Sequence, residues 1–583
     1  MGASSTTTPS VSSLLNPPSI SSHYSRMNQM FLSIYLGQMA THVTIISVCL
    51  SNHNRNIIKY VIDSGAFSCR TSVRCFATTG SLNLDSALQS NIWGSSDSQR
   101  SSGKPDISKK SFDNDLEQML QELFDEIKSL IKAGNNNDAL DLLEANYEAV
   151  SQQIDAGDKG IEQVAILDVI ALGYIAIGDL KMVGFLLNLL NKVVNKLLDD
   201  EPLLDSVLTH MGSMYTTLGK FENSLHVYKR ALGIIQRKYG NNSTLLVTPL
   251  LGMGKVFGLI GRATKATDLY HRAITVLETN IGAENEQLVL PLFALGNLSI
   301  KEGKTTDAEN AFTRILNIYK KLYGEDDERV GMTLCSLANV KCAKGDVDEA
   351  VLLYQNALLL LKNSKNVTSD DGLMEKIMID LAELLHSVGR GSEGRALLEE
   401  CLLITEKHWG KEHPNSVTHL INLATSYSRS KNFVEAERLL RTSLKIMSKA
   451  ASPDDQSITF PMLNLAVTLY NLNQNEEAEQ LALEVLQIRE KAFGKDSLPV
   501  GEALDCLVSI QSRLEKDDKE LLGHLQRVLK IQEKAFGDES EEVIGTLKKI
   551  LFYLDKMGMK NEKFPVQKRL SMLRTKYKEM IQH

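Results

Sequence analysis

Apolar residues recur at intervals of three and four along most of this chain, a pattern typical of amphipathic helices. Seven similar stretches follow one another, the first at 208–232 and the last at 463–486, and most of them begin 42 residues after the previous one. A period of this length predicts an array of small helical units that pack on their neighbours, rather than a set of separate globular domains.

Small residues mark two positions in every repeat, one in each of two predicted helices. Because small side chains let two helices approach closely, each repeat is predicted to be an antiparallel hairpin of helix A, a tight turn and helix B. Glycines at the turn and at the end of helix B fit this prediction, since glycine adopts the left-handed conformation that closes a helix. The first small position holds Gly212, Gly254, Gly296, Ala338, Ala382, Ala424 and Ala466, and the second holds Ser224, Ala266, Ala308, Ala350, Gly394, Ala436 and Ala478. The turn glycines are Gly219, Gly261, Gly303, Gly345 and Gly389, and helix B ends at Gly240, Gly282, Gly324, Gly410, Gly494 and Gly537.

These hairpins resemble the tetratricopeptide repeat. Gly212 and Tyr215, followed by the small residues of helix B, match its roughly 34-residue pattern, and the longer period of 42 is that of the kinesin-light-chain type. Residues 409–440 resemble the repeat of that family closely. The matching residues are Gly410, His413, Pro414, Val417, Asn422, Leu423, Ala424, Tyr427, Glu435, Ala436 and Glu437.

The resemblance implies an all-α fold, a right-handed superhelical solenoid of about eleven helix-turn-helix hairpins over residues 112–583. Within it, residues 112–200 are expected to form divergent hairpins and residues 201–494 the clear repeats. Residues 495–583 are expected to hold degenerate repeats and a basic amphipathic helix that caps the open end.

The first hundred residues differ in composition from the rest. Residues 1–104 contain three acidic and seven basic residues, whereas the remainder contains 69 acidic and 57 basic ones. A Ser-rich, acid-poor start favours a disordered organellar transit peptide over residues 1–77, followed by a polar linker over 78–111. The sequence at Cys75 resembles a plastid processing site and at Phe76 a plant mitochondrial one. The uncharged first 25 residues favour the plastid.

No pattern in the chain indicates catalysis. Phosphate-binding loops, zinc-protease motifs and serine-hydrolase motifs are absent, and the seven cysteines include no Cys-x-x-Cys pair. The sequence therefore predicts a non-enzyme without metal or cofactor. The net charge of −8 disfavours broad binding to nucleic acids or anionic membranes. Residues 30–50 are uncharged but only marginally long and apolar enough for a membrane span.

The family resemblance places a partner-binding groove on helix A, three residues before and one residue after its small position. The groove wall so predicted is mixed, uncharged to apolar, and suits an apolar or amphipathic peptide. Asn297 and Asn339 occupy positions of the family's chaperone-tail clamp, but the clamp's cationic partners are replaced by Phe293, Cys335, Ile379 and Glu383. The candidate groove residues are Thr209, Ser213, Leu251, Lys255, Phe293, Asn297, Cys335, Asn339, Ile379, Glu383, Ile421, Thr425, Leu463 and Val467.

Three hypotheses for function follow. The first is a non-catalytic protein-interaction scaffold in a plastid or mitochondrion, which holds a partner segment in the groove. The second is a cytosolic adaptor related to kinesin light chain, for a motor or the cytoskeleton. The third, an organellar RNA-associated helical repeat protein, is disfavoured by the acidic balance after residue 104.

Overall fold

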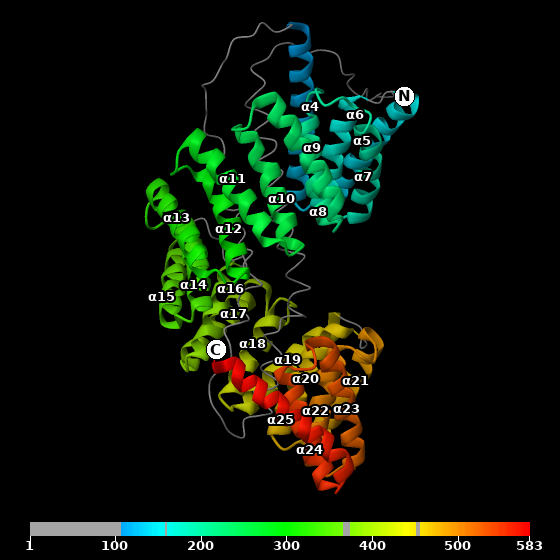
Figure 1. Ribbon diagram of the computed structural model, residues 1–583, viewed down its shortest axis with the longest axis vertical. Coiled ribbons are helices and arrows are strands. Elements are labelled where there is room, and N and C mark those ends of the chain that lie inside the picture. The colour runs from blue at the N-terminus through cyan, green and yellow to red at the C-terminus, as the bar shows by residue number, and fades with distance from the viewer. Residues whose placement is uncertain (1–106, 158–159, 365–372, 451–454, 583) are drawn as a thin grey trace, which may run out of the picture. The chain divides into compact units, whose positions relative to one another are not determined.

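The computed structural model describes residues 107–157, 160–364, 373–450 and 455–582 (Figure 1). In these ranges the regular structure consists of 22 α-helices, α4 to α25, and three short 3-10 helices, with no strand. The predicted all-α array of about eleven hairpins is confirmed, because the 22 helices form eleven consecutive A and B pairs. The predicted leader, its processing site and the uncharged stretch 30–50 lie outside the described residues.

The described residues divide into two compact units, with the boundary between Lys344 and Gly345. Unit 1 contains α4 (Ile107–Lys132), α5 (Asn136–Ala156), α6 (Ile161–Ile177), α7 (Leu180–Val194), α8 (Leu204–Thr217), α9 (Phe221–Tyr239), α10 (Val247–Leu259), α11 (Ala263–Ile281), α12 (Val289–Lys301), α13 (Thr305–Tyr323) and α14 (Glu328–Lys344). Unit 2 contains α15 (Val347–Asn363), α16 (Leu373–Ser387), α17 (Gly391–Trp409), α18 (Ser416–Arg429), α19 (Phe433–Ala450), α20 (Thr459–Asn471), α21 (Asn475–Phe493), α22 (Leu498–Arg513), α23 (Asp518–Phe536), α24 (Glu541–Lys556) and α25 (Lys560–Gln582). The 3-10 helices η2 (Thr244–Leu246), η3 (Glu286–Leu288) and η4 (Gln456–Ile458) precede α10, α12 and α20.

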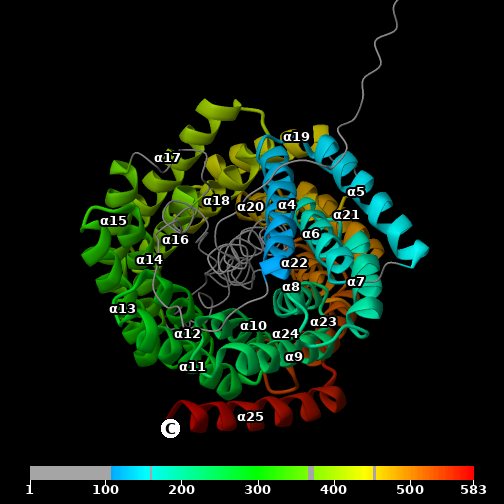
Figure 2. The same cartoon turned by 90° about the horizontal axis from the view of Figure 1, so that it is seen from above.

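Even-numbered helices correspond to helix A and odd-numbered helices to helix B. In unit 1, α10 and α12 lie on the inner side of the row, and α11 and α13 lie on the outer side (Figure 2). Within each unit, helix B packs both on helix A of its own hairpin and on helix A of the next one, which holds for α5 to α13 in unit 1 and for α17 to α23 in unit 2. The apolar core of each unit therefore lies between neighbouring hairpins.

The small positions of helix A in unit 1 accept an aromatic ring from helix B. A Cβ atom built on Gly254 would lie 2.4 Å from Tyr270 Cε1, and one built on Gly296 would lie 2.7 Å from Phe312 Cζ. Tyr270 and Phe312 are 5% and 0% exposed, so these rings have no room to retreat. In unit 1 the glycine at this position therefore makes space for the partner helix.

The tight turns of unit 2 depart from the predicted glycine pattern. Gly389 adopts φ 81° as expected, but the later turns place Lys431, Asn473 and Glu515 at φ 59°, 63° and 55°. Side chains with a Cβ tolerate this left-handed conformation at a cost, and asparagine does so best. These three turns therefore keep the left-handed shape without glycine, and the turn between α24 and α25 has glycine again, Gly558 at φ 71°.

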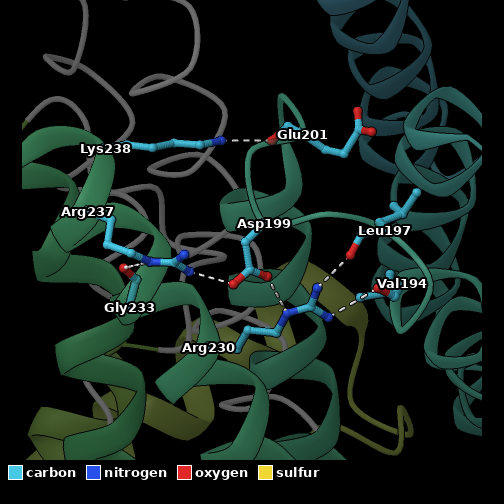
Figure 3. Close-up of polar contacts among 8 residues, drawn as sticks. All are labelled: Val194, Leu197, Asp199, Glu201, Arg230, Gly233, Arg237 and Lys238. Carbon is cyan, nitrogen blue, oxygen red and sulfur yellow. Dashed lines mark hydrogen bonds and ion pairs between the residues drawn. The ribbon is translucent and has the colours of Figure 1, made fainter.

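The connection from α7 to α8 is held by an arginine of the next helix B (Figure 3). Arg230 of α9 donates hydrogen bonds to the carbonyl oxygens of Val194 (3.1 Å) and Leu197 (3.0 Å) and to Asp199 Oδ1 (2.9 Å). Arg237 donates to Asp199 Oδ2 at 2.5 Å. Val194 is the last residue of α7, and Leu197 and Asp199 belong to the connection, so Arg230 ties the end of α7 to the connection that follows it.

Three further arginines link a helix B to the loop of the preceding repeat in the same way. Arg314 donates to the carbonyl of Ala283 at 3.0 Å and pairs with Glu278 at 2.5 Å. Arg527 binds the carbonyl of Lys495 and pairs with Glu490, and Arg569 binds the carbonyl of Asp538 and pairs with Glu533. In each case the carboxylate lies four residues before the glycine that ends helix B, and the carbonyl lies one residue after it. We call this arrangement the arginine clamp.

Candidate functional site

The inner side of helix A can be located from two glycines of α10. Gly254 faces Tyr270 of α11, whereas a Cβ on Gly252 would lie 2.3 Å from Tyr228 Cζ of the preceding helix B, α9. Each residue turns an α-helix by about 100°, so these two positions point toward the layer of B helices from either side. Leu251 and Lys255 lie between them on the other side of α10, facing away from both B helices.

The structure separates the candidate groove residues into two groups. Five are buried and contribute to packing: Thr209, Leu251, Cys335, Leu463 and Val467. Nine are partly exposed: Ser213, Lys255, Phe293, Asn297 and Asn339 in unit 1, and Ile379, Glu383, Ile421 and Thr425 in unit 2. The surface open to a partner is therefore more polar than the predicted wall, since three of the five buried residues are aliphatic. Binding at this surface stays a prediction.

A row of polar side chains follows the A helices of unit 1. Ser213, Lys255, Asn297 and Asn339 lie 42 residues apart on α8, α10, α12 and α14, and all four are partly exposed. Burial lowers the pKa of Lys255 to about 8. Hydroxyl, ammonium and amide groups in one row can donate to carbonyl groups and, except for the ammonium, accept from N–H groups. Such a row suits the backbone of an extended peptide.

The corresponding helices of unit 2 carry charged groups. Arg429 Nη2 lies 3.4 Å from Glu383 Oε1, and burial raises the pKa of Glu383 while Arg429 lowers it. Burial, together with the positive charges of Arg429 and Arg395, lowers the pKa of His386 to about 4. At neutral pH His386 is therefore an uncharged imidazole beside an ion pair.

Asp380, one turn before Glu383 on α16, makes stability depend on pH. Burial raises its pKa from 3.8 to about 7, the nearby Lys376 lowers it, and Glu383 raises it. Because the folded state then binds a proton more tightly than the unfolded state, the free energy of unfolding falls as pH rises from about 4 to 7.

We expect Asp380→Asn to increase the free energy of unfolding by on the order of 1–2 kcal/mol at pH 8, and to have little effect at pH 4. Urea unfolding at the two pH values measures this difference. Asp496→Asn, at an exposed loop position, serves as the matched control. An equal effect of Asp380→Asn at both pH values would show that the carboxylate is not destabilised by burial.

In unit 1, the two positions at which a carboxylate clamp would carry its cations hold Phe293 and Cys335. Phe293 lies one helical turn before Asn297 on α12. Its ring packs edge-on against the ring of Phe312, with ring centroids 5.7 Å apart. Cys335 is 3% exposed. Neither position offers a cation beside Asn297 or Asn339, as the sequence indicates.

The thiols and the clusters of titratable groups show no arrangement for catalysis in the described ranges. Burial raises the pKa of Cys401 and of Cys506 to about 12, so both thiols stay protonated at physiological pH and are poor nucleophiles. Among the described residues, no three His, Cys, Asp or Glu side chains come together in a way that could hold a metal ion. No described helix is long and apolar enough to cross a membrane.

Two buried polar pairs were not predicted. His210 of α8 lies 2.5 Å from Asp168 of α6, and burial raises the pKa of Asp168 although His210 lowers it. In unit 2, Glu375 accepts a hydrogen bond from Thr405 at 2.9 Å and lies 3.3 Å from His419, which lowers the pKa of Glu375. Asp168 and His210 are 42 residues apart, so the repeat register itself was a signal that could have revealed the first pair.

The outer side of unit 1 has a depression of about 410 Å³ between α11 and α13. The Arg314–Glu278 clamp lies at its edge, and α12 forms its floor. None of the candidate groove residues lines it. The lining residues are Thr267, His271, Ile274, Thr275, Glu278, Leu292, Leu295, Ser299, Lys304, Asp307, Asn310, Ala311 and Arg314.

Comparison with known families decides the class of repeat. A tetratricopeptide repeat profile matches residues 203–279, 288–363 and 373–449, and a second profile of the same description matches 462–498. The chain contains tetratricopeptide repeats over these residues. The matched ranges contain all seven repeats that define the 42-residue period, so the predicted resemblance is confirmed. No curated protein matches this tetratricopeptide-repeat chain.

Several solved structures are similar to the chain. The TPR-like repeats of a putative kinesin light chain from Podosopora anserina share 23% identity over 36% of this chain and 99% of that one, with a TM-score of 0.33. The apo form of RapI shares 12% identity over 68% of this chain and 99% of that one, with a TM-score of 0.41. The apo quorum sensor NprR from B. thuringiensis shares 14% identity over 64% of this chain and 99% of that one, with a TM-score of 0.40.

Proposed function

We propose that this tetratricopeptide-repeat protein is a non-catalytic scaffold that binds an extended segment of a partner protein along the A helices of unit 1. The observation that carries the proposal is the row of Ser213, Lys255, Asn297 and Asn339, repeated every 42 residues on the side away from the B helices. An extended backbone repeats its N–H and carbonyl groups regularly, so a regular row of amide and hydroxyl groups can bind it with little dependence on side-chain identity.

The proposed compartment is a plastid, with the mitochondrion as the alternative. The composition of residues 1–104 supports this proposal. A fluorescent reporter fused to residues 1–104 and expressed in plant cells provides the test. Import into plastids supports the proposal, whereas a cytosolic reporter supports the adaptor related to kinesin light chain instead.

The double variant Asn297→Ala/Asn339→Ala is expected to weaken partner binding at least about tenfold, because each hydrogen bond lost to the partner removes about 1 kcal/mol. Affinity purification from intact organelles, followed by titration of the recovered partner, measures this loss. The matched control is Asn317→Ala, an exposed amide on α13 of the outer side. A partner that binds the double variant as tightly as the wild type would exclude the inner row as its site.

A further inference from the structure

The side of α25 that faces away from α24 carries exposed apolar side chains among the described residues. Within unit 2, α21 packs on α22 and α23 packs on α24, so that each helix B is covered by helix A of the next repeat. α25 packs on α24 through Leu570, Val566 and Leu573, which join the cluster of Val543, Ile544 and Leu547. On the opposite side of α25, Phe564 and Met572 are exposed, so no described helix packs over them.

The repeat register shows what that side is built to receive. The hairpin of α22 and α23 maps onto that of α24 and α25 with a shift of 42 or 43 residues, which aligns Phe564 with Leu522 or Leu521. Leu521 and Leu522 are 1% and 5% exposed, because they pack with Ile550 and Tyr553 of α24. Phe564 is 70% exposed, and Met572, two turns later on α25, is 58% exposed. Phe564 therefore stands where the next helix A would pack.

The charge around Phe564 is positive. The sequence of α25 contains seven basic residues and two acidic ones. Lys563, Arg569 and Lys576 pair with Asp555, Glu533 and Glu539. The exposed Lys560, Lys568 and Arg574 make no ion pair within the described residues. A second copy of α25 stacked here would bring like charges together, so an acidic occupant is favoured.

We propose that the outer face of α25, centred on Phe564, Met572 and Lys568, binds an acidic amphipathic helix of a partner protein. This helix stacks on α25 as an additional helix A, with its apolar side on Phe564 and Met572 and its carboxylates toward Lys560, Lys568 and Arg574. The site is distinct from the inner row of unit 1 and does not depend on it.

The test uses the full chain and two labelled peptides. The first has the sequence of α24, residues 541–556. In the protein, α24 is the helix A that packs on the helix B α23. The second carries Lys548→Glu, Lys549→Glu and Lys556→Glu in that sequence, which makes the peptide acidic. We expect the acidic peptide to bind at least about tenfold more tightly than the unchanged one at low salt, as measured by fluorescence anisotropy. The difference should shrink at about 0.5 M salt, because salt screens exposed charges.

The variant Phe564→Ser/Met572→Ser is expected to weaken binding of the acidic peptide at least about tenfold, since it removes the apolar contact. Phe493→Ser, at an exposed aromatic residue of α21, is the matched control and should leave binding unchanged. The thermal midpoints should stay within error, because all three side chains are exposed.

Three results would overturn the proposal. These are equal affinity for the two peptides at low salt, binding that survives Phe564→Ser/Met572→Ser, and binding to phosphatidylserine vesicles but to neither peptide. The last result would assign this face to an anionic membrane. Loss of peptide binding in Asn297→Ala/Asn339→Ala would also contradict the proposal, because that variant alters only the inner row.

Discussion

Gly296→Leu is expected to separate α12 from α13 and to destabilise unit 1 locally. Even a single Cβ at this position would lie 2.7 Å from Phe312 Cζ, and Phe312 is fully buried. Overpacking of this kind costs about 1–3 kcal/mol. Because each hairpin contacts mainly its neighbours, hydrogen exchange should rise over residues 250–344 while residues 456–535 in unit 2 stay protected.

Gly233→Ala is the control, and it is expected to increase the free energy of unfolding instead of lowering it. Gly233 lies within α9, and a Cβ there meets nothing within 4 Å, so alanine should stabilise the helix by up to about 1 kcal/mol. Measuring both variants by urea unfolding separates a loss of space from a general effect of replacing glycine. If Gly296→Leu were neutral, the close approach of the two helices would not depend on the small residue.

Arg489→Ala is expected to cost unit 2 about 3–5 kcal/mol, because it leaves buried polar partners without their cation. The guanidinium of Arg489 donates to Thr459 Oγ1 at 3.2 Å and to the carbonyl of Pro499 at 2.6 Å, and it lies 3.3 Å from Glu502 Oε2. Its side chain is 5% exposed, and burial lowers its pKa. The residue thus joins α21 to the ends of α20 and α22.

The control for this variant is Arg438→Ala, which removes an ion pair with Glu435 from a side chain that is 63% exposed. Exposed pairs contribute at most about 1 kcal/mol, so a small change is expected. Thermal unfolding of both variants, read together with hydrogen exchange over residues 459–502, gives the comparison. Equal losses in the two variants would mean that Arg489 contributes no more than a surface pair.

The sequence was sufficient for the architecture because the repeat pattern is redundant. Gly254 and Gly296 are small for the same physical reason, the aromatic ring of the next helix, and a small residue recurs at this position in all seven repeats. The turns at Lys431 and Asn473 could not be predicted from glycine, since the surrounding hairpin imposes a backbone shape that the local sequence does not favour. The family matches then confirm the class of repeat.

The candidate groove was harder to predict than the fold. The number of residues from the small position predicts which side of helix A a residue occupies. For Lys255 the structure gives the predicted side, the one that faces away from the B helices. That number does not say how closely the adjacent A helices pack, and this packing buries Leu463 while leaving Asn297 partly exposed. The pairing of Asp168 with His210 joins residues 42 apart, so the repeat register, and not a local pattern, was the signal for it.

The arginine clamp bears on how such a chain can change length during evolution. Each participating repeat carries a carboxylate and a carbonyl at the end of one helix B, and the arginine that binds them comes from the next helix B, 31 to 36 residues later for Arg314. Within the stretch from Glu278 to Arg314, an insertion or deletion that is not a whole period would move the arginine away from its carboxylate and carbonyl. A change of length outside the clamped stretches leaves these contacts in register, and the 44-residue step between the repeats that begin at 334 and 378 lies outside them, so selection is expected to tolerate irregular lengths there and to remove them inside a clamp.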